Sequence, residues 1–244
     1  MVNTISFDKK QVKMVAHRGV SGLECENTAA AFVAAGNRSY FGIESDVHVT
    51  KDGRFVIVHD DRTGRVSDVD IPVEESTWEQ LREICLYSNV KEQLPARRDL
   101  RLPTLEDYIR ICQCYDKTAV LELKRQMHPE HIAGIVSQIR QLGYLEKTLF
   151  ISFSWDNMVC LRELLPWQRM QFLVGRGGWT EALPEKLRQH RMDLDIYYGE
   201  ITPQRIALLH SVGIEVNCWT VDDPKVGEEL AAMGVDYITS NILE

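Results

Sequence analysis

Residues 15–61 read VAHRGVSGLECENTAAAFVAAGNRSYFGIESDVHVTKDGRFVIVHDD and contain three short apolar runs that each end in charged or titratable residues. The first run leads into His17-Arg18, the second into Glu44-Ser45-Asp46 and the third into His59-Asp60. Short strands that carry acids, bases and cations at their ends build the active sites of α/β barrels and of open α/β sheets. The stretch therefore predicts an α/β fold whose strand ends form a catalytic cluster.

The spacing inside this stretch predicts how the chain turns. Residues 42–49 alternate apolar residues with Glu44, Asp46 and His48, so we expect a strand on which these three side chains share a face. Residues 51–53, Lys-Asp-Gly, are a tight-turn signature, whereas a parallel crossover would need about a dozen residues. We therefore expect residues 55–58 to return antiparallel along the second strand, which would bring His59 to the same rim as His17.

A short helix is predicted between the first two strands. Asn27 is a suitable N-cap for the alanine-rich residues 28–35, and Gly36-Asn37 is a suitable stop. As a cap, Asn27 would also steady the loop after the first strand. We therefore interpret Asn27 as structural support for the site and not as a substrate contact.

After Pro103 the sequence alternates between strand and helix patterns. Over the whole chain, parallel strands are predicted to begin near residues 14, 42, 119, 148, 170, 194, 214 and 236. Helical spacing of apolar residues occurs over 105–112, 129–142, 156–165, 183–190, 203–212 and 224–233. Eight such units favour a (β/α)8 TIM barrel, without a full eighth helix because the sequence stops at Glu244. An open doubly wound sheet is the alternative, but no GxGxxG or GxxxxGK[ST] phosphate loop occurs.

Residues 60–103 do not fit this alternation. They contain turn signals, one candidate helix over 77–85 and a polar stretch over 88–101. We interpret them as a small inserted subdomain after the second strand, which shapes one side of the site. The chain is then a single barrel domain over residues 1–244 with an insertion at about 51–103.

Bulk properties exclude several classes of protein. A length of 244 residues suits a single α/β barrel of roughly 200–250 residues. The net charge of -8 argues against a general nucleic-acid binder. The N-terminus lacks the apolar region of a signal peptide, and no apolar run approaches the roughly 18 residues of a membrane span. The six cysteines are scattered without a CxxC pair, which is typical of free thiols in a reducing compartment, so we expect a cytoplasmic protein without stable membrane insertion.

Three carboxylates are predicted to meet at the carboxyl ends of neighbouring strands. Glu44 and Asp46 lie on the second predicted strand, and Glu122 lies in Glu-Leu-Lys on the next parallel strand. Packed together they would repel one another, and some would have to take up protons. A divalent cation removes that conflict, and all-oxygen ligands suit Mg²⁺ or Ca²⁺ better than Zn²⁺.

The same rim is predicted to carry proton-transfer groups and cations. His17 and His59 are candidates for general acid and base on the two sides of a phosphorus atom. Arg18 and Lys124 would neutralise phosphate oxygens, Arg18 through a bidentate contact and Lys124 as a point charge. Trp219, at the end of a late strand, could line the wall for a glycerol or alcohol group. Each residue alone has a structural explanation, such as a salt bridge or core packing, and it is their convergence that indicates a site.

These motifs together resemble the glycerophosphodiester phosphodiesterase family. They occur in family order over nearly the whole chain, and they are His17-Arg18-Gly19, Glu26-Asn27-Thr28, Glu44-Ser45-Asp46-Val47, Thr50-Lys51-Asp52-Gly53, Val58-His59-Asp60, Glu122-Leu123-Lys124, Ser152-Phe153 and Trp219-Thr220-Val221. The resemblance implies a TIM barrel with a small insertion. It also implies hydrolysis of glycerophosphodiesters to sn-glycerol 3-phosphate and an alcohol, with Ca²⁺ or Mg²⁺ bound. By position it makes His17 and His59 the acid and base, and Glu44, Asp46 and Glu122 the metal ligands. Arg18 and Lys124 become phosphate contacts. One departure is Thr239-Ser240-Asn241-Ile242, where the family often has Thr-Asp-x-Pro, and it concerns the closing loop.

Two other functions are compatible with the same barrel. A related phospholipase-type enzyme would cleave phosphatidylinositol or sphingomyelin head groups, and a barrel without catalysis would bind a phosphorylated ligand. The expected partner in the favoured interpretation is a small glycerophosphodiester and not nucleic acid. Its reaction would run through attack of the glycerol 2-hydroxyl and a cyclic phosphate. The alcohol, the preferred metal ion, the oligomeric state and the assignment of acid and base to the two histidines stay open.

Overall fold

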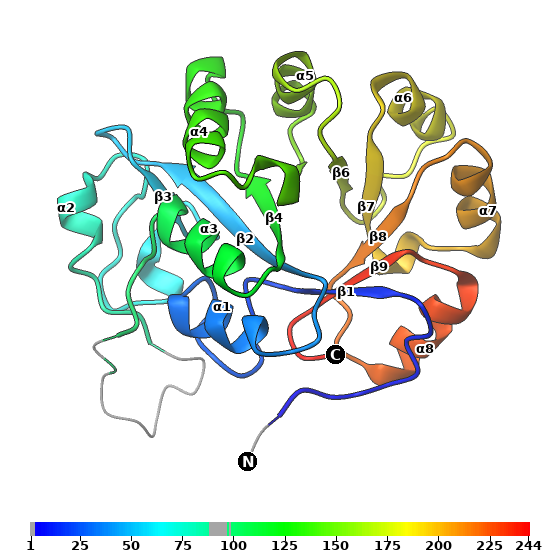
Figure 1. The fold of residues 1–244 in the computed structure, drawn as a ribbon, viewed down its shortest axis with the longest axis horizontal. Helices are drawn as coiled ribbons and strands as arrows, with labels where there is room; N and C mark the ends of the chain where they lie inside the picture. Colours follow the sequence, from blue (N-terminus) through cyan, green and yellow to red (C-terminus); the bar gives the residue numbers. More distant parts are fainter. Residues whose placement is uncertain (1–2, 88–96, 98) are drawn as a thin grey trace.

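Parallel strands form a closed barrel at the centre of this computed structural model, which describes residues 3–87, 97 and 99–244 (Figure 1). In sheet order, the strands run β1-β9-β8-β7-β6-β5-β4-β2, and pairing of β1 with β2 closes the ring. The eight parallel strands in the described residues are β1 (Lys13–Ala16), β2 (Gly42–Val49), β4 (Thr118–Leu123), β5 (Thr148–Ser152), β6 (Met170–Val174), β7 (Asp193–Tyr197), β8 (Val216–Trp219) and β9 (Tyr237–Ser240). The predicted TIM barrel is therefore confirmed.

Helices cover the outside of the barrel between successive parallel strands. They are α1 (Ala29–Gly36), α3 (Leu105–Cys114), α4 (Pro129–Gln141), α5 (Trp155–Leu164), α6 (Leu183–His190), α7 (Pro203–Ser211) and α8 (Pro224–Met233). Residues 241–244 form no helix, and they return to the N-terminal segment through a bridge between Ile5 and Leu243. None of the helices in the described residues is long and apolar enough to cross a lipid bilayer.

The hairpin after β2 forms as the Lys-Asp-Gly turn predicts. β3 (Phe55–Ile57) pairs antiparallel with β2, with Val47 opposite Ile57 and Val49 opposite Phe55. Gly53 adopts a φ of 75°, a left-handed conformation that glycine tolerates without steric cost. The chain therefore reverses direction and runs back along β2, so that the backbone N–H of Val58 donates to the carbonyl oxygen of Asp46 (3.0 Å).

The segment between β3 and α3 packs around an apolar cluster of its own. Buried side chains of Val66, Val73, Leu81, Ile84 and Leu100 belong to this cluster, which is separate from the main core. The segment holds the short 3-10 helix Thr63–Arg65 and α2 (Trp78–Leu81), beside β3 in Figure 1. Residues 88–96 and 98 of the predicted insertion lie outside the described residues.

The predicted helix over residues 77–85 is wrong in length. A capping box between Thr77 and Gln80 starts α2, but the helix ends at Leu81. Leu81, Ile84 and Leu86 are all buried in the same small cluster. The chain leaves the helix after one turn because it must direct these side chains inward, and tertiary packing of this kind overrides helix propensity.

Hydrogen-bonded polar side chains lie inside the lower part of the barrel, below the site at its carboxyl end. At the base, the hydroxyl group of Tyr237 donates a hydrogen bond to Glu215 (2.7 Å) and accepts one from Arg169 (2.6 Å). Higher up, Asn217 donates to Gln171 (3.2 Å) and accepts from Thr239 (3.2 Å). With the apolar side chains of Val15, Val120 and Leu149, these groups fill the lower barrel. The pocket lies at the other end, where His17, Glu44 and Glu122 line it.

Candidate active site

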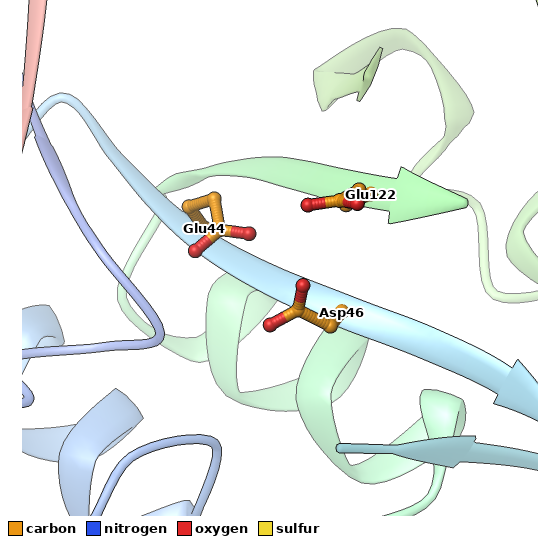
Figure 2. Close-up of side chains that lie close together, drawn as sticks. All are labelled: Glu44, Asp46 and Glu122. Carbon is orange, nitrogen blue, oxygen red and sulfur yellow. The ribbon is translucent and has the colours of Figure 1, made fainter. Parts of the chain in front are cut away.

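Three carboxylates from two neighbouring strands meet inside the mouth of the barrel (Figure 2). Glu44 and Asp46 project from β2, and the register of β2 with β4 places Asp46 beside Glu122. One ligand oxygen from each lies within 4.8 Å of the others. All three are buried, with 3%, 0% and 8% of their surface exposed. The structure therefore brings together the three residues that the sequence predicts as metal ligands.

Two cations border this cluster. The Nζ atom of Lys124 lies 2.8 Å from Glu122 Oε1 and 3.2 Å from Asp46 Oδ1. The backbone N–H of Arg18 donates to Glu44 Oε2 (2.8 Å), and its guanidinium Nε lies 3.7 Å from Asp46 Oδ2. Two positive side chains thus face three buried carboxyl groups, which leaves the cluster short of positive charge.

The pKa values of the three carboxyl groups are driven apart by this environment. Burial, together with the charges of Asp46 and Glu122, raises the pKa of Glu44 well above its usual value. Burial, then the charge of Asp46, raises the pKa of Glu122 to about 7. Burial also opposes ionisation of Asp46, but the charges of Lys124 and Arg18 outweigh it and hold its pKa far below the usual range. Without a further cation, the cluster therefore retains protons at neutral pH.

A divalent cation fits this donor set. All three ligand groups offer carboxylate oxygens, which Mg²⁺ and Ca²⁺ prefer. Asp46 Oδ1 is buried without an aligned hydrogen-bond donor in the described residues, so it has an acceptor site to spare. The residues present are therefore suited to a divalent metal ion.

His17 and His59 both line the pocket that contains Glu44 and Glu122. His17 follows β1, and His59 follows the hairpin strand β3. The Nδ1 atom of His59 lies 2.6 Å from Asp60 Oδ1, and Arg65 donates to the other oxygen of Asp60 (2.5 Å). The antiparallel turn therefore places the second histidine in the same pocket as the first.

A chain of hydrogen bonds fixes the protonation pattern of His17. Asp222 accepts from the side-chain Nδ2 of Asn241 (2.6 Å). This bond turns Asn241 Oδ1 toward His17 Nδ1 (2.7 Å) and Ser21 Oγ (2.6 Å). Because Asn241 Oδ1 can only accept, Nδ1 of His17 carries the hydrogen, and Nε2 keeps its lone pair for a proton.

Both histidines are held neutral at pH 7. Burial, then the adjacent charge of Arg18, lowers the pKa of His17 to about 4. Burial also lowers the pKa of His59, and the charges of Arg18 and Lys124 add to that effect against the opposing pull of Asp46 and Asp60. In their resting state, both imidazoles are therefore free to accept protons.

Asn27 supports the carboxylate cluster, but the prediction that it caps α1 is wrong. Thr28 is the N-cap, because its Oγ1 accepts from the backbone N–H of Ala31 (3.2 Å). Asn27 instead has a φ of 53°, outside the extended region that an N-cap adopts. Its Nδ2 donates to Asp46 Oδ2 (2.8 Å), and its Oδ1 accepts from Ser45 Oγ (3.0 Å). Asparagine tolerates the left-handed backbone conformation, which is what aims this amide at Asp46.

The loop after β1 is also shaped by Arg18 and Gly19. Arg18 has a φ of 53°, and its guanidinium donates to Glu26 (2.9 Å), which Arg65 also contacts. Gly19 has a φ of 77°, and a Cβ atom there would lie 2.6 Å from Cβ of Ala31. Only glycine therefore lets the loop approach α1 closely enough to direct Arg18 toward the carboxylates.

Trp219 and Phe153 form an aromatic wall of the pocket. Their rings pack edge to face with centroids 5.7 Å apart, and Tyr197 extends the aromatic group from β7. The pocket has a volume of about 90 Å³. A second hollow of about 1030 Å³ opens from His59 and Lys124 toward residues 60–75.

Three residues of this region escaped the sequence reasoning. Asp195 lines the pocket from the middle of β7, while Asp222 and Asn241 hold His17. The signal for Asp195 was a carboxylate within the strand predicted to begin near residue 194. Asp222 and Asn241 lie in loops, where spacing carries no signal of contact.

The chain is similar to known proteins over nearly its whole length. The model of the glycerophosphoryl diester phosphodiesterase family matches residues 17–243. Glycerophosphodiester phosphodiesterase 1 of Rattus norvegicus is 32% identical over 97% of this chain and 80% of its own length. A glycerophosphodiester phosphodiesterase of Caldanaerobacter subterraneus is 26% identical, with 93% of both chains covered. A phosphodiesterase structure from Oleispira antarctica, in complex with the product sn-glycerol-3-phosphate, superimposes with a TM-score of 0.86 at 26% identity, covering 98% of this chain and 96% of the other.

Proposed function

The chain belongs to the glycerophosphoryl diester phosphodiesterase family, and on that premise we propose that it hydrolyses glycerophosphodiesters to sn-glycerol 3-phosphate and an alcohol. The observation that carries the proposal is that His17 and His59 line one pocket with Glu44 and Glu122, which form a carboxylate cluster with Asp46. Acid–base groups beside a cluster of oxygen ligands suit displacement at a phosphate diester.

Glu44, Asp46 and Glu122 would hold the metal ion, which we propose is Mg²⁺ or Ca²⁺. When bound, such an ion supplies positive charge to the phosphate oxygens and lowers the pKa of the attacking hydroxyl group. Arg18 and Lys124 border the same carboxylates, so their charged ends lie where phosphate oxygens would bind.

The two histidines would move protons in two in-line steps. In the first step, the glycerol 2-hydroxyl oxygen bonds to phosphorus and the bond to the alcohol oxygen breaks. The neutral histidine takes the hydroxyl proton, and the other histidine, which must have taken up a proton before this step, gives that proton to the departing oxygen. In the second step, water bonds to phosphorus and gives a proton to the histidine that acted as acid, while the ring bond to O2 breaks, O2 takes the proton from the other histidine, and sn-glycerol 3-phosphate is released. His17 is suited to accept a proton because its Nε2 lone pair is free, and Asp60 suits His59 to carry one.

The remaining features agree with a small-molecule enzyme of the cytoplasm. All six cysteines are free thiols, three of them buried, as a reducing compartment would keep them. The net charge of -8 disfavours nucleic acid as a partner. We propose that the segment at about residues 51–103 is an insertion in a single barrel domain and that it forms one wall of the large hollow beside His59.

Incubation with sn-glycero-3-phosphocholine tests the function. We expect release of sn-glycerol 3-phosphate and choline when Mg²⁺ or Ca²⁺ is present, and loss of activity in EDTA that either ion restores, because the acidic cluster needs a cation. A coupled assay for sn-glycerol 3-phosphate measures both. The 2-deoxy analogue should stay intact in the same assay, since it lacks the attacking hydroxyl.

Two other outcomes would favour the alternatives. Cleavage of phosphatidylinositol or sphingomyelin in vesicles, without cleavage of glycerophosphocholine, would indicate the phospholipase-type enzyme. Binding of sn-glycerol 3-phosphate without turnover of any diester would indicate a non-catalytic barrel.

The hydrogen bonds behind His17 predict a rate effect from Asp222→Asn. An amide at position 222 presents an N–H group to Asn241 Nδ2, so the Asn241 side chain must turn and offer Nδ2 to His17. His17 then carries its hydrogen on Nε2, so Nε2 no longer has a lone pair to accept a proton. We expect kcat to fall about 10–100-fold with little change in KM, as is usual for groups that orient a functional side chain.

A neighbouring carboxylate provides the control. Asp223 caps α8, and asparagine is an equally good N-cap, so Asp223→Asn should keep wild-type kcat. Long-range ¹H–¹⁵N correlation spectra should show the His17 hydrogen on Nδ1 in the wild type and on Nε2 in Asp222→Asn. Unchanged kcat together with an unchanged His17 spectrum in Asp222→Asn would rule out this positioning role.

A further inference from the structure

We propose that Asp195 selects the glycerol end of the substrate by forming a hydrogen bond with its terminal hydroxyl group, an inference that rests on the function proposed above. The sequence reasoning gave Asp195 no role, and the proton transfers at phosphorus do not need it. The proposal rests on two observations: Asp195 lines the pocket, and its buried Oδ1 has no hydrogen-bond partner among the described residues.

The carboxyl group of Asp195 has no hydrogen-bond partner among the residues that the structure describes. Only 2% of its surface is exposed, and among the described residues it makes neither a hydrogen bond nor an ion pair. The neighbouring Asn217 differs, because its amide pairs with both Gln171 and Thr239. Gln171 has one buried atom without a partner in the described part of the chain, Nε2, but its Oε1 accepts from Asn217. Buried polar groups in native proteins nearly always have partners, so an exception that faces a pocket indicates a partner on the ligand.

A second unpaired group lines the same pocket. The indole Nε1 of Trp219 is buried and has no acceptor in the described residues. A hydroxyl group both donates and accepts, whereas an indole N–H only donates and a carboxyl oxygen accepts. An alcohol ligand therefore offers the donor that Asp195 lacks and the acceptor that Trp219 lacks among the described residues, and an apolar ligand offers neither.

The size of the pocket identifies the part of the substrate that enters it. Its volume is about 90 Å³, against about 1030 Å³ for the hollow on the insertion side, and His59 borders both. Alcohol groups of varied size fit the larger hollow, so the small glycerol unit is left for the pocket. Ile151 and Leu173 supply an apolar lining for its carbon atoms.

The chemistry then identifies the hydroxyl group. In the proposed reaction the 2-hydroxyl oxygen attacks phosphorus. The terminal hydroxyl group is therefore the one that is free to bind Asp195. That hydroxyl group can donate a hydrogen bond to a carboxyl oxygen of Asp195.

A substrate that lacks only this hydroxyl tests the assignment. The phosphocholine ester of propane-1,2-diol keeps the attacking hydroxyl and loses the terminal one. Wild type with added Mg²⁺ or Ca²⁺ should show kcat/KM about 10–100-fold lower for it than for sn-glycero-3-phosphocholine. Asp195→Leu should lose activity toward the natural substrate and little toward the analogue, so that the preference falls to about threefold or less. Asp195→Asn should restore part of the preference, because an amide still bonds a hydroxyl group.

Asp193→Asn is the matched control for Asp195→Asn, because it replaces aspartate with asparagine at the base of the same strand. There, Asp193 accepts a hydrogen bond from the backbone N–H of Glu215 (2.9 Å). This variant should keep the wild-type preference. Equal losses on both substrates in Asp195→Leu, with the wild-type preference retained, would overturn the proposal. If circular dichroism shows that Asp195→Leu is unfolded, Asp195→Ala decides by the same criterion.

Calorimetric binding of sn-glycerol 3-phosphate and of propane-1,2-diol 1-phosphate separates this inference from the proposed function. A difference in Kd that is present in wild type and lost in Asp195→Leu supports the role of Asp195 even if no diester is hydrolysed. Turnover of glycerophosphocholine with the same Kd ratio in both proteins would leave the function intact and reject the role of Asp195.

Discussion

Replacing His17 or His59 with glutamine is expected to lower kcat for glycerophosphocholine by about 10²–10⁴-fold, the usual contribution of a positioned acid or base. Glutamine keeps a polar side chain of similar size but cannot carry a proton between oxygens. Both imidazoles line the same pocket, and each has its Nδ1 engaged by one residue, Asn241 or Asp60. The loss should therefore appear in kcat, while binding of sn-glycerol 3-phosphate by calorimetry changes much less.

His210 provides the control for this substitution. It lies outside the pocket and pairs with Asp236 at 2.9 Å, so His210→Gln should retain wild-type kcat. The double variant His17→Gln/His59→Gln should lose little more than the worse single variant, because groups that act together in one proton transfer are not additive. Near-normal kcat in either single variant would remove that histidine from the reaction.

The barrel could be predicted from the sequence because local patterns specify it redundantly. β6, α6 and α8 occur at the predicted residues, and β8 begins two residues later than predicted, at Val216. Each of these elements is encoded by the spacing of its own apolar residues, and the strands all bury one face in the same core. The helix over residues 77–85 was predicted wrongly because the length of α2 depends on packing in the small cluster around Leu81. The residues of that cluster are far apart in the sequence.

The residues of the site that lie on strands or directly after them could be predicted from the sequence. Glu44, Asp46 and Glu122 meet because their strands are neighbours in register, which follows from the barrel itself. Asn27 was assigned the wrong structural role, because a left-handed backbone turns its side chain away from α1 and toward Asp46. No sequence spacing reveals such a conformation.

Contacts between distant loops were also beyond the sequence. Asn241 reaches His17 across 224 positions, and it does so in the closing loop where the chain departs from the Thr-Asp-x-Pro pattern. That loop therefore contributes directly to the orientation of a proposed acid–base residue. Departures from a family pattern are most informative where the structure shows what the replacement contacts.

Replacing Glu44 with glutamine is expected to abolish the effect of metal ions on stability while leaving the metal-free protein at least as stable as wild type. The pKa of Glu44 is raised by burial and by Asp46 and Glu122, so its ionised form is unfavourable in the folded state. Removing a charge that the metal-free fold disfavours should not lower the free energy of unfolding. The backbone N–H of Arg18 keeps an acceptor, because glutamine retains a side-chain oxygen.

Bound metal should make the wild type more stable than Glu44→Gln. Ca²⁺ or Mg²⁺ at 100 times its Kd should raise the free energy of unfolding by about 2.7 kcal/mol, since it binds only the folded cluster. Denaturant unfolding with and without the ion measures this gain. Glu44→Gln should show a gain below about 1 kcal/mol at the same concentration, and its kcat/KM should fall at least about 100-fold because the charge on the phosphate is no longer offset.

The matched control is Glu106→Gln, a change of the same chemistry on the exposed face of α3, where Glu106 pairs with Arg110. It should keep both the metal-dependent gain and the activity. A full metal-dependent gain in Glu44→Gln would show that Glu44 is not a ligand. A metal-free Glu44→Gln that unfolds at much lower denaturant than wild type would contradict the account of charge in the cluster. The two measurements therefore separate the metal ligand from the buried acid, two roles that activity alone would not distinguish.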